Sequence, residues 1–310
     1  AARALVGPVR LVVQRQLADG FGNPPRGCRP EVWWWSEGLK SAPEAAIVRD
    51  LEAMRKAGLS AFHLYGGSAT DANWRRKAVF ALGEATRLGL DAYLMVGAAG
   101  CGHPDTPLKF APKDLVFTSA TCRTTNGVLS VRLPRKGKND TPKDPEGRPQ
   151  LYTDIVTFAV PARENAPLDS VRDVSAFLRA DADTLTWAGA PEGTWTVVRI
   201  AWVPLKFGWT GCYIDHLSRE AMDDHWARVV TPLIRDLPPA VRPTLKGVLC
   251  DSWEARTASW TQTFADEFRR RRGYDLRKWL AAKAGLKGGN PAARQSFLRD
   301  FNETVSELLA

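Results

Sequence analysis

The stretch GVLCDSWEARTASW, residues Gly247–Trp260, carries an apolar run that ends in two acids three residues apart. An apolar run of about five residues ahead of a helix is typical of a buried parallel strand. In strand–helix architectures the chemistry gathers where such strands end. We therefore expect Asp251 and Glu254 to lie at the carboxyl end of a strand.

The residues after this strand predict a helix with clear ends. Ser259 and Gln262 have the spacing of a capping box, and Gly273 is placed to end the helix. The expected buried stripe recurs every four residues, consists of Trp260, Phe264 and Phe268, and would pack on the parallel sheet. Four arginines in the last turn suit the negative end of the helix dipole.

Composition predicts a globular protein that is large enough for one α/β domain with an inserted module. The chain has 310 residues, of which 44% are hydrophobic. The net charge of +9 is spread over many segments without a recognised binding motif, so we expect no nucleic-acid partner. The five cysteines lack a C-x-x-C spacing, which argues against a zinc site or a full disulfide framework and leaves room for a single bridge.

The sequence has no apolar run as long as a membrane span and no signal peptide at its start. It begins with Ala-Ala rather than Met, which suggests that an upstream piece was removed. The cellular compartment therefore cannot be derived from these residues alone.

Repeated strand–helix units predict a parallel sheet. The pattern around Gly58–Gly66 returns around Gly89–Gly97 at an offset of 31 residues, which is the length of one such unit. The five expected strands are 31–35, 61–65, 92–96, 211–215 and the run that starts at 245. Ser41 and Glu44 have the spacing of a capping box for the first helix, and Asp71 and Gly89 are placed to cap and to end the second. No glycine-rich phosphate loop follows the first strand, which favours a (β/α)8 TIM barrel over a dinucleotide-binding sheet.

Between residues 110 and 204 the helical period gives way to short alternating runs, with Asn126-Gly127 as a hairpin turn between two of them. This pattern predicts an antiparallel β-rich module inserted into the barrel. The expected domains are 1–109 with a lead-in and three βα units, 110–204 as the inserted module, and 205–310 with units four and five. Five strands cannot close a barrel of eight, so either the sheet is open or the closing strands lie beyond this chain.

Acids and aromatic residues meet at the expected carboxyl ends. Asp251, Glu254, Asp215 and Glu37 would share that edge with tryptophans. Glycoside hydrolysis needs one carboxylic acid to protonate the leaving oxygen and one carboxylate to activate water or attack the sugar. For Glu254 the alternative is a solvated loop acid or a charge at a helix N-terminus, and most of the tryptophans fit core packing equally well. The histidines lack metal-ligand spacing, and we expect them to pack or to form hydrogen bonds.

The segment DSWEARTASWTQTFADEFRRRRGYDLRKWL, residues 251–280, resembles the corresponding segment of glycoside hydrolase family 106, the α-L-rhamnosidases. Weaker matches follow the same order along the chain: RPEVWWW at 29–35, DLEAMRKAGLSAFHLYGG at 50–67, LYTDIVTFAVP at 151–161, TWTVVRI at 194–200 and YIDHLSREAMDDHW at 213–226. At the first strand WWWSEG replaces the Trp-Trp-His-Trp pattern that is usual in the family, so the preferred sugar can differ.

The resemblance implies an inverting hydrolase of terminal α-L-rhamnosides on plant or bacterial polysaccharides, with Glu254 as the general acid. Asp251, Trp253, Asp215, Glu37 and Trp35 are the expected substrate contacts. It also implies a calcium ion near the site, with ligands that the sequence does not identify, and a periplasmic or extracellular location. The catalytic base is expected past residue 310, in the missing barrel strands.

Two other functions remain open from the sequence. The protein could be a carbohydrate-binding barrel without catalysis, which a downstream region lacking a carboxylate in the barrel mouth would support. It could also be a barrel glycosidase for a different sugar, which a panel of aryl glycosides would distinguish.

Overall fold

The computed structural model describes residues 17–35, 37–65, 71–95, 106–163, 166, 170–206, 214–249, 258–286 and 290–309. The chain divides into two compact units, which we call the sheet unit (Ala1–Cys101 with Arg228–Asp251) and the sandwich unit (Gly102–Ala227 with Ser252–Ala310). The mixed α/β character expected from the sequence is confirmed. The three-part division at residues 109 and 204 stays a prediction.

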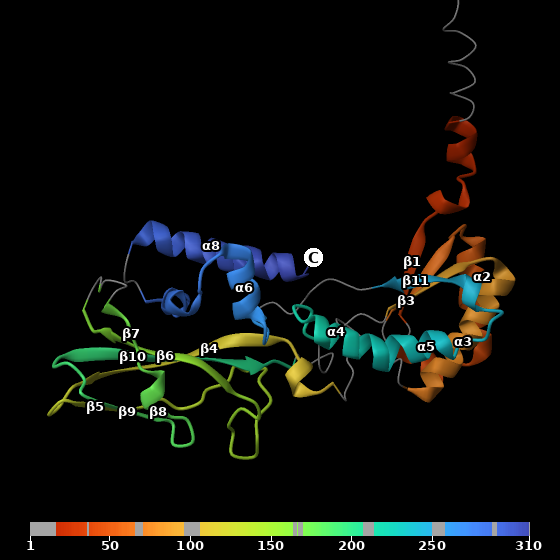
Figure 1. The fold of residues 1–310 in the computed structure, drawn as a ribbon. Helices are drawn as coiled ribbons and strands as arrows, with labels where there is room; N and C mark the ends of the chain where they lie inside the picture. The colour runs from red at the N-terminus through yellow and green to blue at the C-terminus, as the bar shows by residue number, and fades with distance from the viewer. Residues whose placement is uncertain are drawn as a thin grey trace, which may run out of the picture. The chain divides into compact units, whose positions relative to one another are not determined.

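The sheet unit is built on a four-stranded parallel sheet in the order β1-β2-β3-β11 (Figure 1). The strands are β1 (Glu31–Trp35), β2 (Ala61–Tyr65), β3 (Asp91–Met95) and β11 (Leu245–Leu249). β1 and β2 pair without a shift from Glu31↔Ala61 to Trp35↔Tyr65, and Leu249 pairs with Met95. The carboxyl ends of all four strands therefore lie side by side at one edge.

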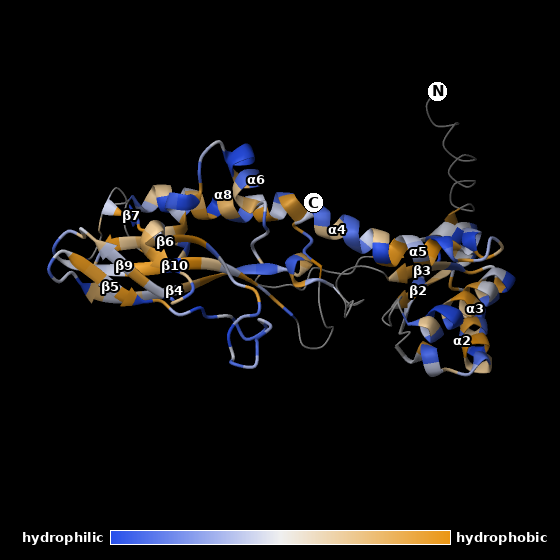
Figure 2. Ribbon diagram, turned by 60° about the horizontal axis from the view of Figure 1, so that its bottom comes forward, coloured by the Kyte–Doolittle hydropathy of each residue, from blue (hydrophilic) through white to orange (hydrophobic). Residues whose placement is uncertain are grey.

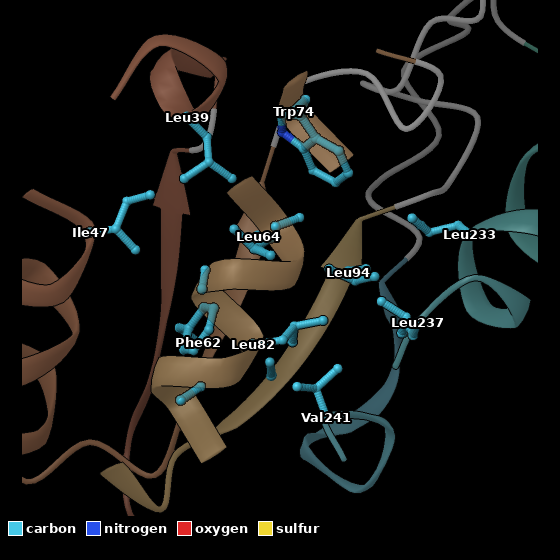
Figure 3. Packing of buried hydrophobic residues seen from close by; sticks show 14 of the residues in the cluster. Leu39, Ile47, Phe62, Leu64, Trp74, Leu82, Leu94, Leu233, Leu237 and Val241 are labelled. Carbon is cyan, nitrogen blue, oxygen red and sulfur yellow. The ribbon is translucent and has the colours of Figure 1, made fainter. Parts of the chain in front are cut away.

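Helices cover one face of this sheet because alternate strand residues are apolar on that side. The helices are α2 (Glu44–Lys56), α3 (Ala72–Leu88) and α5 (Thr231–Arg235), with short 3-10 turns η1 (Arg26–Cys28), η2 (Glu37–Ser41) and η7 (Arg242–Thr244). Phe62 and Leu64 of β2, Leu94 of β3 and Leu82 of α3 are fully buried in the resulting core (Figure 3). Burying each such side chain contributes about 1.5–3 kcal/mol.

The helix ends in this unit partly follow the sequence signals. Asp71 caps α3 by accepting a hydrogen bond from the backbone N–H of Trp74 at 2.9 Å, as predicted. Gly89 ends the same helix with a φ of 67°, a conformation that glycine adopts without strain. The capping box expected at Ser41 and Glu44 is wrong, because α2 begins directly after Pro43 and the Ser41 hydroxyl bonds to the carbonyl of Gly38.

The described residues contain four parallel strands rather than five. Of the strand expected at 211–215, residues 211–213 lie outside the described residues, and Ile214 and Asp215 are not in a strand. β11 pairs directly with β3. The expectation of five βα units is therefore not confirmed.

The sandwich unit contains two antiparallel sheets, β4-β10-β6-β7 and β5-β9-β8 (Figure 1). The strands are β4 (Lys113–Arg123), β5 (Val128–Arg132), β6 (Thr153–Pro161), β7 (Arg172–Asp173), β8 (Leu178–Arg179), β9 (Thr184–Ala188) and β10 (Thr194–Pro204). Asn126 and Gly127 make a tight turn with φ values of 51° and 70°, as expected for a two-residue hairpin. The strands on either side of this turn continue into different sheets, which the alternating pattern could not predict.

Strand β10 lies between β4 and β6 in the larger sheet and is buried on both faces. Trp195 and Val197 pack between the two sheets against Leu185 and Trp187, whereas Val198 and Ile200 face the other side. This double burial explains why residues 194–204 read as an almost continuous apolar run.

Helices α6 (Phe264–Arg272), α7 (Leu280–Lys283) and α8 (Pro291–Leu309) cover the outer face of the larger sheet. The sandwich unit also contains α4 (Arg219–His225) and the 3-10 turns η3 (Leu108–Phe110), η5 (Ser175–Phe177) and η8 (Arg277–Trp279), and the π-helix η6 (Trp226–Val230) follows α4 along the chain. Phe264 and Phe268 of α6 and Phe297 and Phe301 of α8 pack on this sheet, and α8 shows alternating hydrophilic and hydrophobic bands (Figure 2). Within the described residues, no helix has both the length and the apolar character of a membrane span.

The start of α6 differs from the sequence expectation. The helix begins at Phe264 without a side-chain cap, so the capping box at Ser259 and Gln262 is wrong. Trp260 lies in an isolated β-bridge with Lys113 and packs in the same core as the helix. The predicted stop is confirmed, since Gly273 ends α6 with a φ of 79°.

Arg199 of β10 is the largest fully buried charged side chain among the described residues of the sandwich unit. Its guanidinium is fully buried and donates to both oxygens of Asp154 at 2.6 and 2.8 Å, to Asp183 at 2.8 Å and to the carbonyl of Leu133 at 2.7 Å. The ring of Tyr152 lies 4.9 Å away. Burial raises the pKa of Tyr152 to about 12, so its phenol stays neutral beside this network.

We expect Arg199→Lys to lower the free energy of unfolding by about 2 kcal/mol, because an ammonium keeps the charge but loses the paired hydrogen bonds of the guanidinium. Urea unfolding followed by tryptophan fluorescence measures this change. The control is Arg179→Lys, whose ion pair with Asp181 is exposed and should change stability by less than about 0.5 kcal/mol. Equal losses in both variants would contradict the role given to Arg199.

Candidate active site

The candidate site lies at the carboxyl edge of the parallel sheet, where the four strands end together. Trp35 is the last residue of β1, Glu37 opens the 3-10 turn η2, and their side chains lie outside the described part of the structure. Asp251, Trp253 and Glu254 follow β11 directly in sequence and also lie outside the described residues. Their roles stay predictions, supported by the position of the strand ends that precede them.

The sheet face opposite the helices carries a row of aromatic groups below that edge. Trp33, His63, Tyr93 and Gly247 are neighbours across the four strands. The His63 ring stacks on Tyr93 with centroids 4.7 Å apart, and its Nε2 lies 2.8 Å from a carboxylate oxygen of Glu31. Trp33 is half exposed.

Gly247 of β11 lies beside Tyr93 at the end of this row. A Cβ at position 247 would lie 3.4 Å from the Tyr93 ring, which is an ordinary van der Waals contact. The row therefore reaches β11, the strand ahead of the segment that carries Glu254.

Asp215, the one predicted contact whose side chain is described, forms a buried ion pair in the sandwich unit. Its Oδ2 lies 2.9 Å from the Lys113 ammonium, and both side chains are at most 2% exposed. Oδ1 accepts a hydrogen bond from the backbone N–H of Leu217 at 3.1 Å. Burial raises the pKa of the Asp215 carboxyl, and the Lys113 charge opposes that shift. Its role as a substrate contact stays a prediction.

Lys113 also binds the backbone of Ser259 and Trp260, which follow the segment that carries Glu254. The Lys113 carbonyl accepts hydrogen bonds from the backbone N–H groups of Ser259 and Trp260 at 3.1 and 3.2 Å. The Ser259 hydroxyl donates to Asp114 at 2.8 Å, and Lys138 pairs with the same carboxylate. Lys113 of β4 therefore binds both Asp215 and the backbone of Ser259 and Trp260.

Sequence reasoning missed this anchor. Lys113, Asp114 and Lys138 belong to no motif, and each would be taken for an exposed charge at the start of a strand or in a polar loop. The spacing of Ser259 and Gln262 indicates a helix cap, whereas the Ser259 hydroxyl bonds to Asp114. Only the pairing of residues 102 and 145 positions apart in sequence reveals their role.

Among the described residues, no group of three or more His, Cys, Asp or Glu side chains is placed to hold a metal ion. The calcium ion that the resemblance implies stays a prediction. His63, which bonds to Glu31 and stacks on Tyr93, is a hydrogen-bonding residue of the sheet face.

Comparison with known proteins relates this arrangement to sugar-cleaving enzymes. A curated relative from Formosa agariphila, named "Putative beta-glucuronidase", is 26% identical over 95% of this chain. The structure of a rhamnosidase from Novosphingobium sp. PP1Y has a similar fold, with a TM-score of 0.66 and 19% identity over 94% of this chain. The chain spans 28% of the length of that relative and 45% of that of the rhamnosidase.

The family model described as alpha-L-rhamnosidase matches residues 149–310, slightly more than half of the chain. That match contains the segment with Asp251, Trp253 and Glu254 as well as β6, β10 and the helices packed on them. The chain therefore belongs to the alpha-L-rhamnosidase family, glycoside hydrolase family 106.

Proposed function

We propose that the protein of which this chain is part hydrolyses terminal α-L-rhamnosides of plant or bacterial polysaccharides. The observation that carries this proposal is the family match over residues 149–310, which includes Glu254 and its neighbours. The aligned carboxyl ends of β1, β2, β3 and β11 support it, because enzymes with parallel strand–helix sheets hold their catalytic residues at such an edge. We further propose that the four strands are one part of a (β/α)8 barrel.

Glu254 is the proposed general acid. It would donate its proton to the glycosidic oxygen as the bond to the anomeric carbon breaks. A second carboxylate, about 6.5–9.5 Å away, would take a proton from the water that attacks from the opposite face, which inverts the configuration. The family resemblance places this base past residue 310. Asp251, Trp253, Glu37 and Trp35 are the proposed sugar contacts at the same edge.

The protein would meet a plant or bacterial polysaccharide outside the cytoplasm, so we propose a periplasmic or extracellular location. By the family resemblance we also propose a calcium ion near the site.

Hydrolysis of 4-nitrophenyl α-L-rhamnopyranoside by the full-length protein tests the proposal. We expect release of nitrophenol, and proton NMR at early times should show the β-anomer of rhamnose first, because the proposed mechanism inverts the anomeric centre. Early α-anomer would contradict inversion, and absence of turnover with retained sugar binding would favour a binding barrel.

One alternative substrate is favoured by a specific observation. The relative that matches 95% of this chain is named for β-glucuronide cleavage. The same assay with 4-nitrophenyl β-D-glucuronide separates the two: higher kcat/KM for the glucuronide would replace rhamnose by glucuronic acid in the proposal.

A further inference from the structure

The sandwich unit contains a groove of about 940 Å³, and its lining includes none of the residues placed in the candidate active site. One wall comes from β6, β7 and the residue before β7, and the other from the segment that follows α6. The lining residues are Phe158, Val171, Arg172, Asp173, Tyr274, Asp275, Arg277, Lys278 and Trp279. This volume is at the upper end of the range for small-molecule sites, with room for more than one sugar ring.

Two aromatic rings in the groove are held in fixed positions. Tyr274 and Trp279 are partly buried and meet edge to face, with centroids 6.4 Å apart. Trp279 stacks on Phe297 at 5.9 Å, and the Tyr274 hydroxyl donates to Asp300 at 2.8 Å. Because these contacts fix both rings from behind, binding a ligand to their accessible surfaces costs little side-chain entropy.

Two cations of the groove, Arg277 and Lys278, are more available than its acids. Arg277 is exposed and its side chain donates one hydrogen bond, to the carbonyl of Ile155 at 2.9 Å. Within the described part of the chain, the exposed Lys278 ammonium has no ion-pair or hydrogen-bond partner.

The two carboxylates, in contrast, are already engaged. Asp275 accepts from Arg269 at 2.9 Å and from the backbone N–H of Arg277 at 2.8 Å. Asp173 accepts from the backbone N–H of Ser175 at 3.0 Å and from its hydroxyl at 2.6 Å. The groove therefore presents positive charge beside an aromatic surface, in a chain whose net charge is +9.

We propose that this groove binds an anionic oligosaccharide, with a carboxylate or sulfate group on Arg277 and Lys278 and a sugar ring against Tyr274 and Trp279. A guanidinium and an ammonium are suited to either oxyanion, and aromatic surfaces match the apolar faces of pyranose rings. A nucleic acid fits less well, because two available cations in one groove do not follow a phosphate backbone. The groove would hold an acidic polysaccharide on the protein independently of bond cleavage.

Binding is measured by titration calorimetry on the full-length protein carrying Glu254→Gln, so that hydrolysis does not interfere. The probes are tetragalacturonate, its fully methyl-esterified form and sulfated maltotetraose. We expect binding of one or both anionic probes, weakening as salt rises, and binding of the neutral ester at least tenfold weaker. The anion that binds more tightly identifies the natural group.

Two variants locate binding in the groove. Lys278→Glu reverses an exposed charge without a partner, so it should leave the melting temperature unchanged and weaken binding of the anionic probe at least tenfold. Arg277→Gln with Lys278→Gln should weaken it further. The control pair, Lys143→Gln with Arg163→Gln, removes the same charge from exposed positions outside the groove in the same unit and should change affinity less than twofold.

The proposal is overturned if the methyl ester binds as tightly as the acid, if neither anionic probe binds, or if the control pair weakens binding as much as the groove pair. Hydrolysis of the small aryl rhamnoside by the groove variants with Glu254 intact should equal that of the wild type. A protein that binds the anionic probe in the groove but cleaves no glycoside would leave this proposal standing and remove the proposed function.

Discussion

Glu254→Gln is expected to lower kcat for phenyl α-L-rhamnoside by about 10²–10⁴-fold, because an amide cannot protonate the departing phenoxide. The loss should be small for a 2,4-dinitrophenyl rhamnoside, whose leaving group departs without a proton. The general acid must be protonated to act, so wild-type activity should fall as pH rises through its pKa. In the variant this fall at high pH should be absent.

The matched control is Glu267→Gln in the same family segment. Glu267 pairs with Arg270 at 2.7 Å and with Arg271 at 3.2 Å on the surface of α6. Its variant should keep wild-type kcat within about twofold, since surface ion pairs contribute little to the fold. If Glu254→Gln lost as much activity on the dinitrophenyl substrate as on the phenyl one, the role of proton donor would be wrong.

Some local backbone signals were predicted correctly from the sequence because they depend on a few neighbouring residues, although both capping boxes, at Ser41 with Glu44 and at Ser259 with Gln262, were wrong. Asp71 caps α3, and Gly89 and Gly273 end their helices with positive φ values. The parallel pairing of the first three strands was also predictable, since strand–helix units of one length return to the same sheet, and the third strand, expected at 92–96, is at 91–95.

Signals that depend on a distant partner could not be predicted. The apolar stripe of Phe264 and Phe268 shows that α6 is covered, but their partners are Val198 and Ile200 of the antiparallel sandwich, whereas the sequence suggested the parallel sheet. The local spacing of Ser259 predicted a helix cap, but its hydroxyl donates to the Asp114 carboxylate instead. A short polar side chain satisfies its hydrogen bond wherever the fold brings a partner, so its local pattern decides little.

In the candidate site, too, features that depend on nearby residues were predictable and features that depend on a distant partner were not. Its edge was predictable from the strand ends, and its acids from the spacing after β11 together with the family resemblance. The anchor formed by Lys113 and Asp215 was not, because it joins residues 102 positions apart in sequence, and each residue alone has the pattern of a solvated charge.

Lys113→Met is expected to lower the free energy of unfolding by about 3–5 kcal/mol, because it leaves the Asp215 carboxylate buried without its counter-charge. Urea unfolding of the full-length protein measures this loss. Lys109→Met is the control: Lys109 lies four residues earlier, pairs with Glu220 at 3.7 Å on the surface, and should change stability by less than about 0.5 kcal/mol.

A double variant separates the two roles open to Asp215. Lys113→Met with Asp215→Asn removes both charges and keeps an acceptor for the N–H of Leu217, so it should recover at least half of the stability lost in Lys113→Met alone. If Asp215 holds the fold, Asp215→Asn alone should be destabilised, and the protein that remains folded should keep its KM for the aryl rhamnoside. If Asp215 binds substrate, the same variant should raise KM and leave the unfolding free energy unchanged. Because the carboxylate is almost fully buried against Lys113, we expect the first result.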